Sequence, residues 1–207
     1  MITLYLIRHG ETVWNFSGQY QGVTDVALSD LGRRQAQCLV DYFADLPLDA
    51  IYSSDLERAV ETAQPLAISK GLTVELRSGL REINFGDWEG LTYEQINSKW
   101  PGSIEHMYAN ASSVRISNGE SFGDVQHRAA KTIEEITHNH PDEAVAIVCH
   151  GGTIRCILCT LLGLDLDLAW NFRQANANVT MIEYYGDRNL LALLNDTHHL
   201  KNYKLKS

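Results

Sequence analysis

Residues 2–7 read Ile-Thr-Leu-Tyr-Leu-Ile, and Arg8-His9-Gly10 follow at once. A short apolar run that is rich in branched and aromatic residues predicts a strand buried on both faces of a sheet. Ligands of open α/β sheets bind at the carboxyl ends of the strands, which is where Arg8 and His9 fall. A guanidinium beside an imidazole can bind an anion there and attack it. We expect Gly10 to let the backbone approach that ligand closely.

The stretch 144–149, Ala-Val-Ala-Ile-Val-Cys, repeats this pattern and is followed by His150-Gly151-Gly152. An apolar helix is expected next, over about 154–162. The start of a helix offers free N–H groups and the positive end of the helix dipole, which suits a phosphate. A single His at a strand end is more often structural than catalytic. Two such ends, one with an adjacent Arg, predict a shared anion site.

A third strand end carries a second Arg. Residues 50–52 form a short predicted strand, and Ser54 with Glu57 matches the capping box that starts a helix. This helix is expected to run to about residue 69. Arg58 then lies in its first turn, close to the carboxyl end of the strand, and we expect it at the same sheet edge as the two His residues.

The remaining segments continue this alternation of strands and helices. The expected elements are a helix from Ser29 to about Phe43, a strand over 72–76, a helix from Ser121 to about His138, and a hairpin of strands over 178–185 and 189–195. The hairpin adds an antiparallel edge. The expected fold class is therefore α/β, a three-layer α/β/α sandwich with a mostly parallel sheet and an antiparallel edge strand.

Residues 77–120 interrupt the alternation with glycines, a proline and short helices predicted over 93–99 and 104–110. A segment this long and irregular inside a compact domain is usually a lid or a substrate-binding insertion. A tolerated surface excursion is the alternative. We expect a single domain over residues 1–207 with the insertion at about 77–120.

The overall charge limits the classes of partner. The formal net charge of −9 disfavours nucleic acid and anionic membrane surfaces. An anionic substrate must therefore be held by a locally positive pocket. There is no signal-like start and no apolar run long enough to span a bilayer, so a cytoplasmic location is expected. The polar tail over 201–207 is expected to be mobile.

Metal and redox sites are not expected. Cys156 and Cys159 match the Cys-x-x-Cys spacing, but no second pair follows them. All four cysteines are therefore interpreted as buried thiols. The histidine pairs near 138–140 and 198–199 lack the spacing of a helical zinc pair. We expect neither a metal nor another cofactor.

The residues at the strand ends fit phosphoryl transfer. Arg8 and Arg58 can each bind phosphate oxygens through paired hydrogen bonds. One neutral imidazole can attack phosphorus and form a phosphohistidine, while the other stabilises the transferring group. The leaving alkoxide needs a proton from a carboxylic acid. The insertion supplies three candidates for this acid, which are Glu82, Asp87 and Glu89.

The segment Arg8-His9-Gly10-Glu11-Thr12, with Trp14-Asn15 behind it, resembles the signature of the histidine phosphatase superfamily, the phosphoglycerate mutase-like family. Four further segments agree in order: Tyr20-Gln21-Gly22, Ser53-Ser54-Asp55-Leu56-Glu57-Arg58-Ala59, Leu80-Arg81-Glu82 and His150-Gly151-Gly152. Together they cover nearly the whole chain. The resemblance implies a phosphoglycerate mutase-like fold.

The resemblance also implies roles for individual residues. His9 matches the phosphorylated nucleophile, and His150 the second His of the pocket. Arg8 and Arg58 match the phosphate-binding pair, and Glu82 matches the proton donor. The expected residues that hold phosphate or substrate are Asn15, Gln21, Gly22 and Gly151.

Within the family, residues 80–92 and 194–200 resemble the bacterial α-ribazole phosphatase branch most. That enzyme removes phosphate from α-ribazole 5′-phosphate late in cobalamin synthesis. The resemblance thus favours a metal-independent phosphomonoesterase that uses a phosphohistidine and acts on α-ribazole 5′-phosphate. The alternatives are a broad-specificity or phosphoserine-type phosphatase, then a phosphoglycerate mutase, and last a non-catalytic phospholigand-binding protein.

Departures from the mutase pattern favour hydrolysis. Phe85 stands where mutases carry a Tyr, and Gln21 where they carry a Thr. Arg115 has no neighbouring Arg, although mutases bind the substrate carboxylate with an Arg pair in the insertion. The expected partner is a small phosphorylated metabolite, and a homodimer is one option for the oligomeric state. Four aromatic residues could line the pocket or pack as core: Trp88, Trp100, Tyr108 and Phe122.

Overall fold

A six-stranded sheet in the order β3-β2-β4-β1-β5-β6 forms the centre of the computed structural model, which describes residues 1–201. The pairings β1–β4, β4–β2 and β2–β3 are parallel, whereas β5 pairs antiparallel with both β1 and β6. The expected α/β class with an antiparallel edge is therefore confirmed. The strands are β1 (Ile2–Arg8), β2 (Ala50–Ser53), β3 (Val74–Leu76), β4 (Ala144–Cys149), β5 (Val179–Tyr184) and β6 (Leu190–Asp196).

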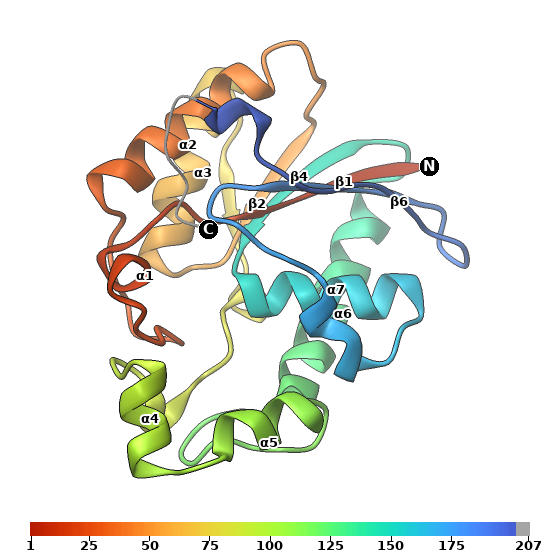
Figure 1. Ribbon diagram of the computed structural model, residues 1–207. Coiled ribbons are helices and arrows are strands. Elements are labelled where there is room, and N and C mark those ends of the chain that lie inside the picture. Colours follow the sequence, from red (N-terminus) through yellow and green to blue (C-terminus); the bar gives the residue numbers. More distant parts are fainter. Residues whose placement is uncertain (202–207) are drawn as a thin grey trace.

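Helices cover both faces of this sheet. Figure 1 shows α2 and α3 on one side and α6 and α7 on the other. The α-helices are α1 (Val13–Ser17), α2 (Asp30–Tyr42), α3 (Glu57–Lys70), α4 (Tyr93–Lys99), α5 (Ser103–Ala109), α6 (Phe122–Asn139) and α7 (Gly151–Leu162). The 3₁₀ helices are η1 (Ser78–Leu80), η2 (Gly86–Trp88), η3 (Leu166–Asn171) and η4 (His198–Leu200).

The alternation of side chains along β1 supplies both cores. Leu4 and Leu6 pack with residues of α6 and α7, whereas Tyr5 and Ile7 pack with residues of α2 and α3. All four side chains are buried. Burial on both faces is what the continuous apolar run predicts. Removing a side chain such as Leu6 down to Ala typically costs about 2–5 kcal/mol.

Two helix starts agree with the sequence prediction. The Gly32 N–H donates to Ser29 Oγ at the start of α2, over 3.0 Å. The Asp124 N–H donates to Ser121 Oγ at the start of α6, over 3.2 Å. Each serine satisfies a backbone N–H that has no partner inside its own helix.

The start of α3 differs from the prediction. The helix begins at Glu57, and Leu56 before it makes no side-chain cap, so the predicted capping box is wrong. Ser54 Oγ lies instead 2.8 Å from His150 Nε2. The first N–H of the helix, that of Glu57, donates to Asp25 Oδ1 over 2.7 Å. A carboxylate from a distant loop thus replaces the local cap.

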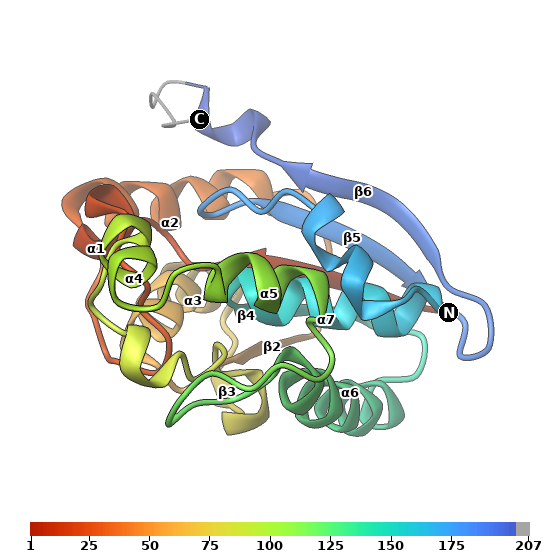
Figure 2. The ribbon, with the colours of Figure 1, turned by 60° about the horizontal axis from the view of Figure 1, so that its bottom comes forward.

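Residues 77–120 pack as a separate unit against one end of the α/β/α layers (Figure 1). Apolar side chains from this segment, Ile83, Trp88, Ile96 and Ile104 among them, share one buried cluster with Phe122 at the start of α6. Figures 1 and 2 place α4 and α5 outside the α/β/α layers, with α4 close to α1. The loop after α1 contacts this segment directly, since the Tyr20 N–H donates to Leu91 O.

Within residues 1–201, no helix is long and apolar enough to cross a membrane. The tail expected to be mobile, 201–207, lies outside the described part of the chain except for Lys201.

Candidate active site

Three neighbouring strands bring the predicted site residues together. β1 lies beside β4 with Arg8 opposite Cys149, and β2 lies on the other side of β4. His9 and His150 follow β1 and β4 directly, and their ring centroids are 5.2 Å apart. Arg58 enters from the first turn of α3, which follows β2. The expectation that these side chains share one edge is borne out by this geometry.

A cavity of about 220 Å³ lies at this edge, and we call it the inner cavity. Its lining includes seven of the predicted site residues, which are Arg8, His9, Asn15, Gln21, Gly22, Arg58 and Glu82. His150 is fully buried against His9, and Gly151 lines an adjoining cavity described below. A larger cavity of about 620 Å³ lies between α6, α7 and the β5–β6 hairpin, and none of the nine predicted site residues lines it.

The tautomer of His9 follows from its hydrogen bond. Nδ1 lies 2.7 Å from Gly10 O. A carbonyl oxygen can only accept, so Nδ1 carries the proton and Nε2 keeps a free lone pair. Burial, followed by the positive charges of Arg58 and Arg8, holds the pKa of His9 well below its usual 6.5. His9 is therefore neutral at physiological pH, the form in which an imidazole is nucleophilic.

His150 depends on Ser54, whose role the sequence did not indicate. Both residues are fully buried, and Ser54 Oγ already accepts the Leu56 N–H. The buried hydroxyl hydrogen of Ser54 has no other acceptor within residues 1–201, so His150 Nε2 is assigned as its acceptor. Burial, followed by the charge of Arg58, lowers the pKa of His150, so the ring is neutral. With Nε2 accepting, its one proton lies on Nδ1.

The two guanidinium groups are held by backbone carbonyls. Arg58 donates from Nη1 to Thr24 O over 2.9 Å and from Nη2 to Gly22 O over 2.7 Å. Arg8 donates from Nη1 to Gln174 O over 2.6 Å. Within residues 1–201, Nε of each Arg and Nδ1 of His150 are buried without a hydrogen-bond partner. Buried donors are normally paired, so these three nitrogens are available to an anion.

Asn15 and Gln21 have their amide oxygens occupied by other groups. Asn15 Oδ1 accepts from the Thr12 N–H and from Asn176 Nδ2, each over 3.1 Å. Gln21 Oε1 accepts from the Thr12 hydroxyl over 3.0 Å. Since an amide also carries two N–H donors, both side chains can present these to the inner cavity.

Glu82 occupies the start of α7, where the sequence analysis expected a phosphate. The N–H groups of Gly152 and Thr153 donate to its carboxylate over 3.1 and 3.2 Å. A Cβ on Gly152 would lie 2.5 Å from Glu82 Oε1, so only glycine permits this approach. The N–H groups at the start of α7 therefore hold the Glu82 side chain in place.

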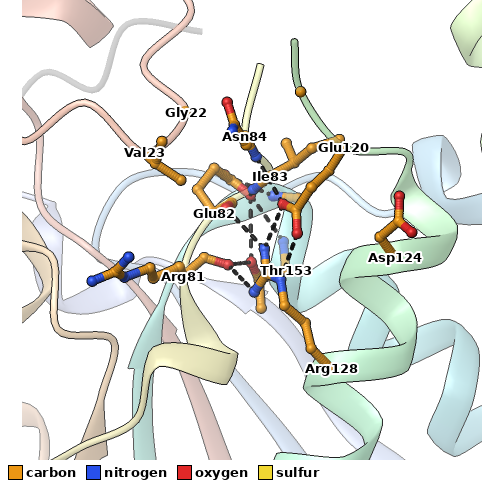
Figure 3. A network of polar contacts seen from close by, with 12 residues as sticks. Gly22, Val23, Arg81, Glu82, Ile83, Asn84, Glu120, Asp124, Arg128 and Thr153 are labelled. Carbon is orange, nitrogen blue, oxygen red and sulfur yellow. Dashed lines mark hydrogen bonds and ion pairs between the residues drawn. The ribbon is translucent and has the colours of Figure 1, made fainter. Parts of the chain in front are cut away.

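Figure 3 shows how the Glu82 segment is fixed. Arg128 of α6 donates to the carbonyl oxygens of Gly79, Arg81 and Glu82 over 2.6–2.9 Å. Its guanidinium also pairs with Glu120 at 3.1 Å. The role of Arg128 was not predictable from the sequence, because a contact between α6 and an irregular segment leaves no local pattern.

The other two acid candidates lie outside the inner cavity. Asp87 is exposed and accepts a hydrogen bond from Asn118 Nδ2. Glu89 accepts the N–H groups of Val23, Thr24 and Phe85 and so braces the loop around Gly22. Glu82 alone of the three lines the inner cavity.

Two glycines serve packing. Gly22 has φ +57°, and a Cβ there would collide with the Glu89 carboxylate, so a larger residue would displace the carbonyl that holds Arg58. A Cβ on Gly10 would lie 2.6 Å from Gly32 O. Gly10 therefore allows α2 to approach the end of β1.

An outer cavity of about 300 Å³ adjoins the inner one and shares Arg8, Tyr20, Glu82 and Phe85 with it. Its further lining residues are Tyr108, Phe122, Gly151, Gly152, Arg155 and Trp170. The sequence analysis missed Arg155 and Trp170. The spacing of Gly151 and Arg155, about one helical turn, is the signal that could have indicated Arg155.

The sequence left open whether four aromatic residues line the substrate pocket or pack in the core, and the structure shows two in each role. Tyr108 and Phe122 line the outer cavity. Trp88 and Trp100 belong to the packed core of the 77–120 segment. The wall of the outer cavity is completed by Trp170 from η3, whose ring centroid is 4.3 Å from that of Tyr108.

No group of three or more His, Cys, Asp or Glu able to hold a metal ion occurs within residues 1–201. Cys149, Cys156 and Cys159 are buried thiols, as expected, whereas Cys38 is half-buried. Burial raises the pKa of Cys149, which keeps its thiol protonated.

Comparison with known proteins agrees with this geometry. The family model of the histidine phosphatase superfamily (branch 1) matches residues 4–197. Phosphoserine phosphatase 1 of Hydrogenobacter thermophilus is 35% identical over 207 residues, which are 100% of this chain and 98% of that protein. A phosphoserine phosphatase variant from Entamoeba histolytica, solved with phosphoserine, superposes with a TM-score of 0.86 at 32% identity, covering 97% of this chain and all of that one.

A putative α-ribazole-5′-phosphate phosphatase from Escherichia coli also superposes with a TM-score of 0.86, at 27% identity and with 94% of this chain and 96% of that one covered. The similarity to phosphoserine phosphatases is therefore at least as strong as the similarity to the α-ribazole branch, and the comparisons do not support a place in cobalamin synthesis. The chain belongs to the histidine phosphatase superfamily, branch 1.

Proposed function

We propose that this protein is a metal-independent phosphomonoesterase that works through a phosphohistidine at His9. The observation that carries the proposal is the convergence of Arg8, Arg58 and the neutral His9 on the inner cavity, with the neutral His150 packed against His9 and three buried nitrogens unpaired within residues 1–201. Phosphoryl transfer depends mainly on positioning and on neutralising the charge of the phosphoryl oxygens. Two guanidinium groups and neutral donors supply both.

In the first step, His9 Nε2 attacks phosphorus, and the P–O bond to the leaving group breaks as the P–N bond forms. Glu82, in its protonated form, gives its proton to the leaving oxygen. His150 donates from Nδ1 to a phosphoryl oxygen, which stabilises the transition state. The support for this assignment is the free lone pair on His9 and the position of Glu82 in both cavities.

In the second step, water attacks phosphorus and gives its proton to the Glu82 carboxylate. The P–N bond breaks, inorganic phosphate forms, and His9 returns to its neutral state. Asn15 and Gln21 hold the phosphoryl oxygens through their amide N–H groups. Gly22 acts by holding Arg58, and Gly151 offers its N–H at the start of α7.

Phosphoserine is the leading candidate substrate. A relative 35% identical over the whole chain is named for phosphoserine, and a structural neighbour at 32% identity was solved with it. A mutase reaction is disfavoured because Arg115, the one Arg of the insertion considered for carboxylate binding, donates to Gly119 O and Asp124 outside both cavities.

α-Ribazole 5′-phosphate is the second candidate. The structural similarity to the protein from Escherichia coli supports it. The aromatic side chains Tyr108, Phe122 and Trp170 in the outer cavity also offer surfaces for a flat base.

We also propose that residues 1–207 are one domain in which the 77–120 segment is the substrate-binding insertion. Glu82, Phe85 and Tyr108 of this segment line the outer cavity. Its apolar side chains share a buried cluster with residues of α6 and α7, which supports a segment packed as part of the domain.

The test is phosphate release from phosphoserine, 3-phosphoglycerate, α-ribazole 5′-phosphate and p-nitrophenyl phosphate in excess EDTA. We expect turnover that EDTA leaves unchanged, with kcat/KM highest for phosphoserine. A preference for α-ribazole 5′-phosphate would establish the second candidate. Tight phosphate binding without turnover of any substrate would contradict the enzymatic function and favour a phospholigand-binding protein.

A further inference from the structure

The outer cavity contains a cation that the proposed chemistry does not use. Arg155 lies on α7, one turn after Gly151, and lines the outer cavity but not the inner one. Other arginines near the site are paired with carboxylates: Arg81 with Asp55 at 2.7 Å and Arg128 with Glu120 at 3.1 Å. Within residues 1–201, Arg155 takes part in no ion pair.

The guanidinium of Arg155 is nevertheless fixed in position. Nε donates to Phe172 O over 3.0 Å, and the guanidinium carbon lies 5.6 Å from the ring centroid of Trp170. The Trp170 ring is fixed in turn, since its Nε1 donates to Tyr108 O over 3.1 Å. A cation held by its Nε and by an aromatic face keeps its terminal nitrogens for another partner.

Arg155 and Arg8 lie close enough to bind two groups of one small molecule. A Cβ placed on Gly151 would be 3.3 Å from Arg155 Nη1 and 3.5 Å from Arg8 Nε, so these nitrogens flank Gly151 on the wall between the cavities. Burial and then the positive charge of Arg155 lower the pKa of Arg8 to about 10. Two cations this close gain from a ligand with two negative groups.

Glu82, the acidic group whose charge acts on Arg155, does not form an ion pair with it. The attraction of Glu82 is felt at Arg155, yet the Glu82 carboxylate is bound to the N–H groups of Gly152 and Thr153. Arg8 and Arg58 are required for the phosphoryl group under the proposed function. The charge of Arg155 is therefore left for a second anionic group of the substrate.

We propose that Arg155 binds the carboxylate of a substrate whose phosphoryl group occupies the inner cavity, which defines the substrate class as small phosphomonoesters with a carboxylate a few bonds from the ester oxygen. This proposal rests on the proposed function. Arg155 reaches the outer cavity from α7 and not from the 77–120 segment. It acts on substrate selection and takes no part in bond making or breaking.

The experiment compares phosphoserine with phosphoethanolamine, which lacks only the carboxylate. Arg155→Gln should raise the KM for phosphoserine by about tenfold to a hundredfold, the range expected for a lost charge-assisted hydrogen bond, with kcat less affected. Turnover of phosphoethanolamine should stay unchanged. Arg155→Lys should restore part of the phosphoserine affinity. Arg115→Gln removes the same charge outside both cavities and serves as the matched control.

Equal effects of Arg155→Gln on both substrates, or an effect of Arg115→Gln as large, would overturn the carboxylate site. Calorimetric binding of phosphoserine to His9→Ala, with and without Arg155→Gln, gives the same comparison without turnover. A wild-type protein that binds phosphoserine through Arg155 but releases no phosphate would contradict the proposed function alone. Unchanged binding together with intact turnover would contradict this inference alone.

Discussion

The two cavities are built in different ways. Arg8, His9 and His150 stand at the carboxyl ends of the adjacent parallel strands β1 and β4, where the sheet fixes each backbone on both sides. Arg58 and Glu82 join them from α3 and from the 77–120 segment. The outer cavity is lined by side chains from a loop, the 77–120 segment, α7 and η3, which are far apart in the sequence. The comparison indicates that chemistry is placed on the rigid sheet and substrate selection on the segments around it.

Substitution of the nucleophile should produce the largest loss of activity, and the loss should be the same for every substrate. His9→Ala removes the only proposed acceptor of the phosphoryl group, so kcat should fall by at least about a thousandfold for every phosphomonoester. The measurement is phosphate release across the substrate panel. His127→Ala, at an exposed position of α6, is the control. Substantial turnover by His9→Ala would show that the inner cavity works differently.

Glu82 lines both cavities, so its effect should depend on the leaving group. Glu82→Gln should slow the hydrolysis of phosphoserine by about 10²–10⁴-fold, because the serine alkoxide needs a proton. p-Nitrophenyl phosphate has a stable leaving group and should be slowed by less than about tenfold. The exposed Asp87→Asn variant is the control. Equal slowing of both substrates would argue against Glu82 as the acid.

Ser54 contacts His150 but lines neither cavity, so its substitution should affect the chemistry without affecting substrate selection. Ser54→Ala leaves His150 free to adopt the other tautomer. We expect kcat to fall by about tenfold for all substrates alike, with little change in KM, as for a lost hydrogen bond to an imidazole. Ser53→Ala, at the neighbouring buried hydroxyl, is the control. A change confined to one substrate would contradict a role in positioning His150.

His9 should make the stability of the protein depend on pH. The pKa of His9 lies well below 6.5 in the folded protein, so the unfolded chain binds more protons as the pH falls through 6.5. The free energy of unfolding should then decrease relative to that of His9→Asn, by up to about 1.4 kcal/mol per pH unit. Denaturant unfolding at pH 7.5 and 5.5 measures the difference. Parallel pH dependences would contradict the lowered pKa.

The inner cavity could be predicted because its residues carry local signals. Arg8, His9 and His150 follow continuous apolar strands, and the order of the strands brings them together. Ser54, Arg128 and Arg155 could not be predicted in this way, because each acts through a contact with a distant segment. The same reason explains the wrong capping box, in which a distant Asp replaces the local Ser.

The branch of the family was also hard to infer from short stretches. Residues 80–92 resemble the α-ribazole branch, but several of them maintain the insertion itself. Trp88 is buried in its core, Glu89 braces three backbone N–H groups, and Gly86 has φ +50° against Ser117 O. Similarity at such positions therefore reflects the folding of the insertion more than the identity of the substrate's alcohol leaving group.

The phosphohistidine itself is the most direct test of the account. Wild-type protein mixed with phosphoserine and quenched during turnover should carry one phosphoryl group on the peptide that contains His9. This group should be lost in acid and kept in base, and it should be absent from His9→Ala. Turnover without any phosphoenzyme, or a phosphoryl group on another residue, would contradict the central claim.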